Sequence, residues 1–237
     1  MTEEKTQGIV LKLIDYKDAN KLASIFTLHG GIITAKFNGV KKEKAKLKSV
    51  AQPFVFADLS INQIGLHKTV IGAQIIDNFY QILADYNKTI CGYVVLDLIK
   101  SILPENQPEQ DLFLITIAAL KNIETRNEYV STVDFMLKFL NFSGVGVELF
   151  DAEHVFLDKS SGDFTTTRTM NSIEIDKKVY GVLKDISKNP ESMLNIDLTN
   201  IETLPNFSES TIKQALRLLG NIVYLRFNVE IKSLHFI

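Results

Sequence analysis

Apolar and polar residues alternate through the first eighty residues of the chain, which is the period-two pattern of β-strands. In the run from Gly8, the alternation places Ile9, Leu11 and Leu13 on one face. The pattern predicts five strands, at about residues 8–15, 22–28, 32–37, 54–61 and 66–76. Gly30-Gly31 stands between the second and third of these runs and predicts a hairpin turn.

Beyond residue 76 the pattern changes to the period of an α-helix. It predicts helices at about residues 77–103, 110–123, 130–142, 177–187 and 210–227. The third of these is apolar around most of its circumference, so we expect it to be buried. Ser208 or Ser210 is suited to cap the last one. Residues 144–176 are rich in Gly, Thr and Asp and lack a helical period, which predicts a hairpin or an irregular lobe.

These elements predict an α+β protein with two domains. Five short strands at such spacing favour a closed OB-fold barrel over residues 1–78. A mainly helical domain is then expected over residues 79–237, with the small irregular lobe inserted at about 144–176.

Charge divides the chain in the same way. The protein has a net charge of −2, yet residues 1–80 hold 11 basic and 7 acidic side chains. Much of the excess lies in residues 38–48, here named the lysine loop, which contain five lysines and one glutamate between two predicted strands. A local basic loop on a small strand-rich domain is typical of a phosphate-binding surface.

The sequence is compatible with two backbone conformations of the lysine loop. If the loop is extended, Lys42, Lys44, Lys46 and Lys48 point the same way. If it is helical, Lys41, Lys44 and Lys48 share a face. A solvated loop that protects a sheet edge is the alternative to DNA or RNA binding.

Aromatic residues could add base stacking to these charges. Phe37 is in register with Ile33 and Ala35, which favours core packing. Phe54 and Phe56 share a face, and the pattern does not decide between core packing and base stacking for them. Tyr16, beside a charged turn, is the best candidate for an exposed stacking residue.

The motifs of common enzymes are missing. The sequence lacks a phosphate-binding GxxxxGK[ST] loop, a GxSxG elbow and an HExxH helix. The four histidines are scattered, and the single cysteine, Cys91, lies in an apolar run and is expected to be buried. No cofactor and no metal are expected. The N-terminus lacks a signal-peptide pattern and no apolar run reaches the length of a membrane span, so we expect a cytoplasmic, non-enzymatic protein.

The N-terminal third resembles the bacterial recombination mediators of the RecO family. The resemblance lies in Gly8-Ile9-Val10-Leu11-Lys12, Asp15-Tyr16-Lys17-Asp18-Ala19-Asn20-Lys21-Leu22, Phe26-Thr27, Gly31, Lys36-Phe37-Asn38-Gly39-Val40-Lys41-Lys42, Leu47 and Gln52-Pro53-Phe54. Lys232-Ser233 also looks like that family's ending. Strong correspondence covers about the first 60 residues.

This resemblance implies a DNA repair and recombination mediator located at the bacterial nucleoid. Such proteins bind single- and double-stranded DNA, anneal complementary strands, and work with RecR and single-stranded-DNA-binding protein (SSB) to load recombinase. The resemblance places a set of residues in the DNA-contacting region: Lys36, Lys41, Lys42, Lys44, Lys46 and Lys48, with Tyr16 as a stacking candidate. The alternative is an OB-fold RNA-binding or adaptor protein without annealing activity.

Two further features of the family bear on the helical half. Many members carry two cysteine pairs that bind zinc, but here Ala152 and Val155 stand where the first pair is expected and no cysteine follows. Metal binding is therefore not carried over, and packing through Leu149, Phe150, Phe156 and Phe164 is expected to hold the lobe. The family also receives the acidic tail of SSB in a basic-rimmed apolar pocket, for which Lys213, Leu216 and Arg217 are the candidates.

Overall fold

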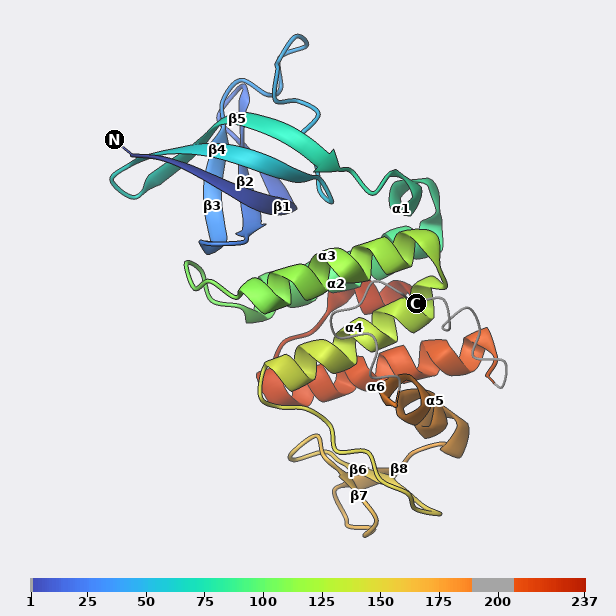
Figure 1. Ribbon diagram of the computed structural model, residues 1–237. Coiled ribbons are helices and arrows are strands. Elements are labelled where there is room, and N and C mark those ends of the chain that lie inside the picture. Colours follow the sequence, from blue (N-terminus) through green and yellow to red (C-terminus); the bar gives the residue numbers. More distant parts are fainter. Residues whose placement is uncertain (1, 189–206) are drawn as a thin grey trace. The chain divides into compact units, whose positions relative to one another are not determined.

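The computed structural model describes residues 2–188 and 207–237 (Figure 1). The chain forms two compact units. The first comprises Met1–Tyr80 and Leu96–Leu114, and the second comprises Gln81–Val95 and Ile115–Ile237. The predicted domain boundary at residue 78 stays a prediction, because these units assign part of the helical region to the strand-rich half.

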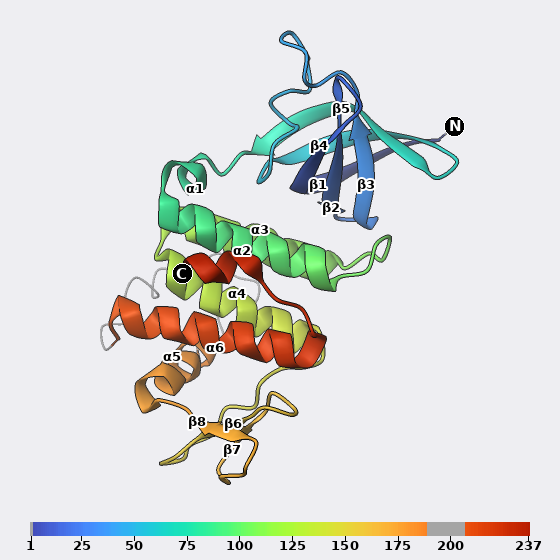
Figure 2. The same ribbon diagram turned by 180° about the vertical axis from the view of Figure 1, so that it is seen from behind.

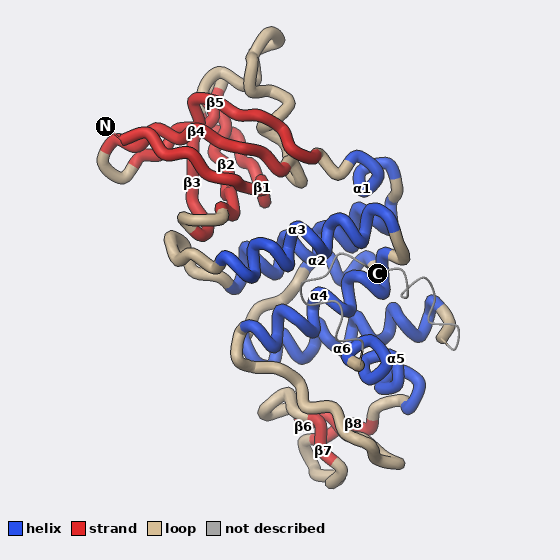
Figure 3. The backbone as a smooth tube through the Cα atoms, viewed as in Figure 1, coloured by secondary structure: helices blue, strands red, loops and turns tan. Residues whose placement is uncertain are grey.

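The first unit contains five strands, coloured red in Figure 3. They are β1 (Thr2–Tyr16), β2 (Asn20–Thr27), β3 (Gly31–Phe37), β4 (Phe56–Ile64) and β5 (His67–Asp77). They close into a barrel in the order β1-β2-β3-β5-β4. Only the β3–β5 pair is parallel, and it is short, joining Ala35–Phe37 to Lys68–Val70. Together with the helices that follow, this five-stranded barrel confirms the predicted α+β class with an N-terminal OB-fold.

The barrel interior is filled by alternate residues of the strands. Ile33, Ala35 and Phe37 of β3 belong to this core, and Phe37 is fully buried, as the sequence predicts. The prediction for β1 is wrong in one respect. The register of β1 against β2 shifts between Val10 and Lys12, so Leu11 occupies a β-bulge. A bulge exchanges the two faces of a strand, and period-two reading across residues 9–13 cannot detect it.

Residues 103–114 cover part of the barrel within the first unit. The Phe113 ring contacts Phe26 and Phe56 edge to face, with centroids 5.4 and 6.0 Å away. Gly31, at φ +66°, lies so close that an added Cβ would sit 2.0 Å from the Gln107 carbonyl oxygen. The hairpin turn predicted at Gly30-Gly31 therefore has a second requirement, because only glycine allows this approach.

The helices are α1 (Tyr80–Ala84), α2 (Tyr86–Ile102), α3 (Gln110–Thr125), α4 (Glu128–Phe142), α5 (Lys177–Ser187) and α6 (Glu209–Phe227), followed by the 3₁₀ turn η2 (Lys232–Phe236). The single helix predicted over residues 77–103 is instead interrupted. Asp85 separates α1 from α2, and its carboxylate accepts a hydrogen bond from the Lys88 amide at 3.0 Å. Aspartate competes with helical hydrogen bonding in this way and starts a new helix.

In the second unit, α4 and α6 lie side by side (Figure 2). Helix α4 is buried around most of its surface, as predicted, and Phe139 contacts Phe135 and Phe227. Ser208 caps α6 by accepting a hydrogen bond from the Thr211 amide at 3.2 Å. This contact resolves the choice between the two serines.

The lobe between α4 and α5 contains a small sheet in the order β7-β6-β8. Its strands are β6 (Phe156–Asp158), β7 (Phe164–Thr165) and β8 (Ser172–Glu174). A third strand therefore makes this segment more regular than a hairpin. The Tyr180 ring of α5 contacts Phe150 and Phe164, with centroids 6.3 and 5.1 Å away, which agrees with the expected packing.

Candidate nucleic-acid interface

The lysine loop is anchored to the barrel by its apolar residues. Val40, Val50 and Ala51 belong to the barrel core, and Leu47 packs against it while half-buried. Polar side chains lie between these apolar anchors, and five of them are exposed lysines: Lys41, Lys42, Lys44, Lys46 and Lys48. Because the anchors are fixed in a close-packed core, the lysines are presented from a defined surface rather than from a free tether.

The backbone of the lysine loop is a series of turns. The amides of Lys42, Ala45 and Lys48 each donate to the carbonyl three residues earlier, at 3.0, 3.2 and 3.2 Å. The loop is thus neither the extended segment nor the helix considered from the sequence. Hydrogen bonds between residues three positions apart form these turns, and in such turns the lysines can all be exposed without lying on one face.

The lysine loop is also tied to the β1–β2 turn. The Lys41 amide donates to the Ala19 carbonyl at 3.1 Å, and the Gly39 amide donates to Asn20 Oδ1 at 2.8 Å. Lys41 Nζ lies 2.9 Å from Asp15 Oδ2. The hydrogen bond from Lys41 is the largest cause that lowers the pKa of Asp15, followed by the Lys41 charge. Lys41 is therefore the one loop lysine whose charge is compensated among the described residues.

A shallow groove of about 490 Å³ lies between the lysine loop and β5. Lys42, Lys44 and Lys46 line it from the loop, with Leu47 beside them. The other side is formed by Thr69, Val70 and Ile71 of β5. In the described part of the chain, these three lysines make no ion pair with an acidic side chain, so the groove carries uncompensated positive charge.

The remaining predicted DNA-contacting residues lie outside this groove. Lys36 is half-buried on β3, where its position alternates with the core residues Ala35 and Phe37, so it faces outward. Tyr16 is 36% exposed, and Lys17 Nζ lies 5.4 Å from the centre of its ring. Their roles stay predictions.

Sequence reasoning missed two contributors to this surface. In the sequence, Asp15 is only one residue of a charged turn, but in the structure it neutralises a lysine 26 positions away. The sequence pattern places Ile71 only within a strand, but in the structure it lines the groove and is 50% exposed. Local spacing reveals neither residue's role, because both roles depend on proximity to the lysine loop, which is distant in sequence.

Removal of the Asp15 charge is expected to strengthen binding of single-stranded DNA. In Asp15→Asn, Lys41 loses its ion pair and gains one phosphate contact. The affinity is then expected to rise about 3-fold, and the log–log slope against salt to steepen by about 0.7. Fluorescence anisotropy over a salt series measures both quantities. Asp18→Asn is the matched control, since it makes the same charge change in the same turn without releasing a lysine; an equal slope change there would contradict the assignment.

The candidate SSB-tail residues are placed on α6. Leu216 is fully buried. Lys213 Nζ lies 2.8 Å from Glu209 and 4.7 Å from the centre of the Tyr129 ring. The pKa of Lys213 is raised, chiefly by Glu209 and then by Tyr129. Arg217 is exposed. The pocket at these residues stays a prediction.

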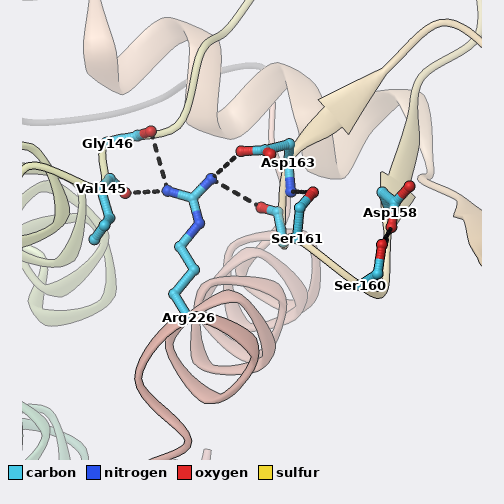
Figure 4. Close-up of polar contacts among 8 residues, drawn as sticks. Val145, Gly146, Asp158, Ser160, Ser161, Asp163 and Arg226 are labelled. Atoms are coloured by element: carbon cyan, nitrogen blue, oxygen red, sulfur yellow. Dashed lines mark hydrogen bonds and ion pairs between the residues drawn. The ribbon is translucent and has the colours of Figure 1, made fainter.

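Arg226 joins the lobe to helix α6 through its guanidinium group (Figure 4). Arg226 of α6 donates to the carbonyls of Val145, Gly146 and Gly162, the last two at 3.0 Å. It also lies 2.7 Å from Asp163 Oδ1. Over residues 2–188 and 207–237, no three His, Cys, Asp or Glu side chains are grouped to bind a metal ion. Ala152 and Val155 offer no ligand, so the residues of this lobe do not fit the zinc site that the family resemblance implies.

No helix in the described ranges is both long and apolar enough to cross a membrane. The lone cysteine, Cys91, is buried, and burial raises the pKa of its thiol to about 12.

A five-stranded barrel with a cationic groove is typical of oligonucleotide-binding proteins. Comparison with known proteins agrees with this class. The chain matches the family description "Recombination protein O N terminal" over residues 1–79 and "Recombination protein O C terminal" over residues 83–235. It therefore belongs to the RecO family of recombination and DNA repair proteins.

Curated relatives carry the name DNA repair protein RecO. The protein of Shouchella clausii is 24% identical over 244 aligned residues, which cover 99% of this chain and 93% of the relative. That of Clostridium novyi is 27% identical and covers 78% of this chain and 77% of its own. That of Clostridium perfringens is 33% identical over 143 residues, covering 59% and 58%.

Proposed function

We propose that this protein is a non-enzymatic mediator that binds single- and double-stranded DNA through the lysine loop and anneals complementary strands. The observation that carries this proposal is the set of lysines that line the groove beside β5 and that, among the residues the structure describes, form no ion pair with an acidic side chain. Lysine is suited to sequence-independent contact, because a flexible point charge requires no single bidentate geometry. Membership of the RecO family supports DNA as the polyanion.

Annealing follows from charge compensation. Two complementary strands repel each other through their phosphates, and neutralised phosphates lower that barrier. A protein that contacts the backbone alone leaves the base edges free to pair. The barrel surface therefore needs no catalytic group to accelerate pairing.

The same proposal includes help in loading recombinase onto SSB-coated DNA, together with RecR. The acidic tail of SSB is the expected ligand of the second unit, with Arg217 as its exposed basic residue beside Lys213 and Leu216. Titration of the isolated tail peptide against wild-type protein and Arg217→Glu measures this contact.

Annealing of SSB-coated complementary strands tests the proposal. The wild-type protein is expected to accelerate pairing, as followed by fluorescence quenching between labelled strands. Matched DNA and RNA oligomers are titrated in parallel. RNA preference without annealing would support an RNA-binding or adaptor protein instead, and turnover of a labelled strand would contradict the non-enzymatic assignment.

A further inference from the structure

The two sides of the groove differ in chemistry. The lysine loop supplies three ammonium groups, whereas β5 supplies Thr69, Val70 and the exposed side chain of Ile71. A cationic side alone would be satisfied by any phosphate backbone, single- or double-stranded. An exposed apolar side chain across from it adds a second requirement for the ligand.

The exposure of Ile71 has a structural cause. Along β5, Gly72 pairs with Ser60 and Val70 pairs with Ile61, which leaves Ile71 unopposed in a bulge. The pairing of β5 with β3 ends at the same point, because Phe37 opposite Val70 is the last residue of β3 before the lysine loop departs. Bulges direct side chains away from their regular positions and recur beside functional sites.

Single and double strands present different surfaces to such a groove. A single strand carries phosphates and unstacked base faces together. A duplex keeps its base faces stacked inside and presents phosphate and sugar outward. The lysines can contact both ligands, but Ile71 can contact a base face only in the single strand.

We propose that the groove selects single-stranded DNA, with phosphates against Lys42, Lys44 and Lys46 and a base face against Ile71. This inference rests on the proposed function and adds to it the residue that separates the two strand types. None of the groove-lining residues is aromatic. The contact is therefore apolar rather than a stacking interaction, and it leaves the pairing edge of the base accessible to a complementary strand.

Substitution of Ile71 tests this selectivity. Ile71→Asn is expected to weaken binding of a single-stranded oligomer about 5-fold, and binding of a duplex with equal phosphate number less than 2-fold. The salt slope for the single strand is expected to stay unchanged, since no phosphate contact is lost. Ile75→Asn is the matched control. Ile75 is also exposed on β5, at 38%, but does not line the groove, and its substitution should change neither affinity.

A second variant keeps the test valid if Ile71→Asn unfolds. Ile71→Trp places an aromatic ring at the same point and is expected to strengthen single-strand binding about 10-fold, without a comparable gain for the duplex. Equal effects on both ligands, or none on either, would overturn the selectivity. Preferential binding of an equally charged acidic peptide would overturn it as well.

The lysine variants and the Ile71 variants together distinguish a failure of the single-strand selectivity from a failure of the proposed function. If lysine substitutions abolish DNA binding while the Ile71 variants treat both ligands alike, the selectivity is wrong and the DNA site stands. If the lysine substitutions leave DNA binding unchanged, the proposed function itself is wrong.

Discussion

Reversal of four loop charges, K42E/K44E/K46E/K48E, is expected to reduce affinity for single-stranded DNA by at least about 100-fold at low salt. Each lysine lost removes a phosphate contact worth about 0.7 in the log–log salt slope, so a slope near −2.8 should disappear. In the wild type, the same slope corresponds to a fall of about 50-fold between 50 and 200 mM salt. Lys41 is left intact because Asp15 already compensates it.

The fold of this variant should be unchanged. All four side chains are exposed, whereas the anchors Val40, Val50 and Ala51 are untouched. Circular dichroism and the melting temperature measure this. The control is K159E/K177E/K178E/K188E, which gives the same net charge through exposed lysines of the second unit. Equal loss of affinity in the control would mean that net charge, not the lysine loop, determines binding.

Loss of the Arg226 guanidinium is expected to lower the free energy of unfolding by about 3 kcal/mol in Arg226→Met. The side chain is only 7% exposed and donates to three carbonyls besides Asp163. Loss of the guanidinium leaves the carbonyl groups that accept from it without this hydrogen-bond donor in a partly buried site. Urea denaturation measures the loss, and faster amide exchange at Asp158 and Gly162 would locate it in the lobe.

Two further variants separate shape from charge. Arg226→Lys keeps the charge but loses the planar fork, so it should recover less than half of the stability. Asp163→Asn keeps every carbonyl contact and removes only the negative charge of a partner that is 65% exposed, so it should cost less than about 1 kcal/mol. Affinity for DNA should be unchanged in all three variants. Wild-type stability in Arg226→Met would contradict the assignment of this contact.

Much of the fold follows from local pattern. Strands β2 to β5, the buried helix α4 and helix α5 begin and end within a few residues of their predicted positions, because burial on one face imposes a period that the sequence must carry. Strand β1 is longer than predicted, since it begins at Thr2, six residues before its predicted start. The errors lie where a single residue changes the local geometry. Leu11 shifts the register of β1, and Asp85 divides a helix whose apolar period continues across it.

In the candidate site too, some features are determined by the sequence and others by the tertiary structure. The sequence alone determined that five lysines are concentrated between two strands and that the cysteines of a zinc lobe are missing, since composition and order are visible without a fold. Tertiary structure decided which lysine Asp15 compensates, which lysines share a groove with Ile71, and that Arg226 holds the lobe. The contact of Asp15 with Lys41 joins residues 26 positions apart, and that of Arg226 with Val145 joins residues 81 positions apart. Their geometry is set by strand register and helix packing, which no local pattern specifies.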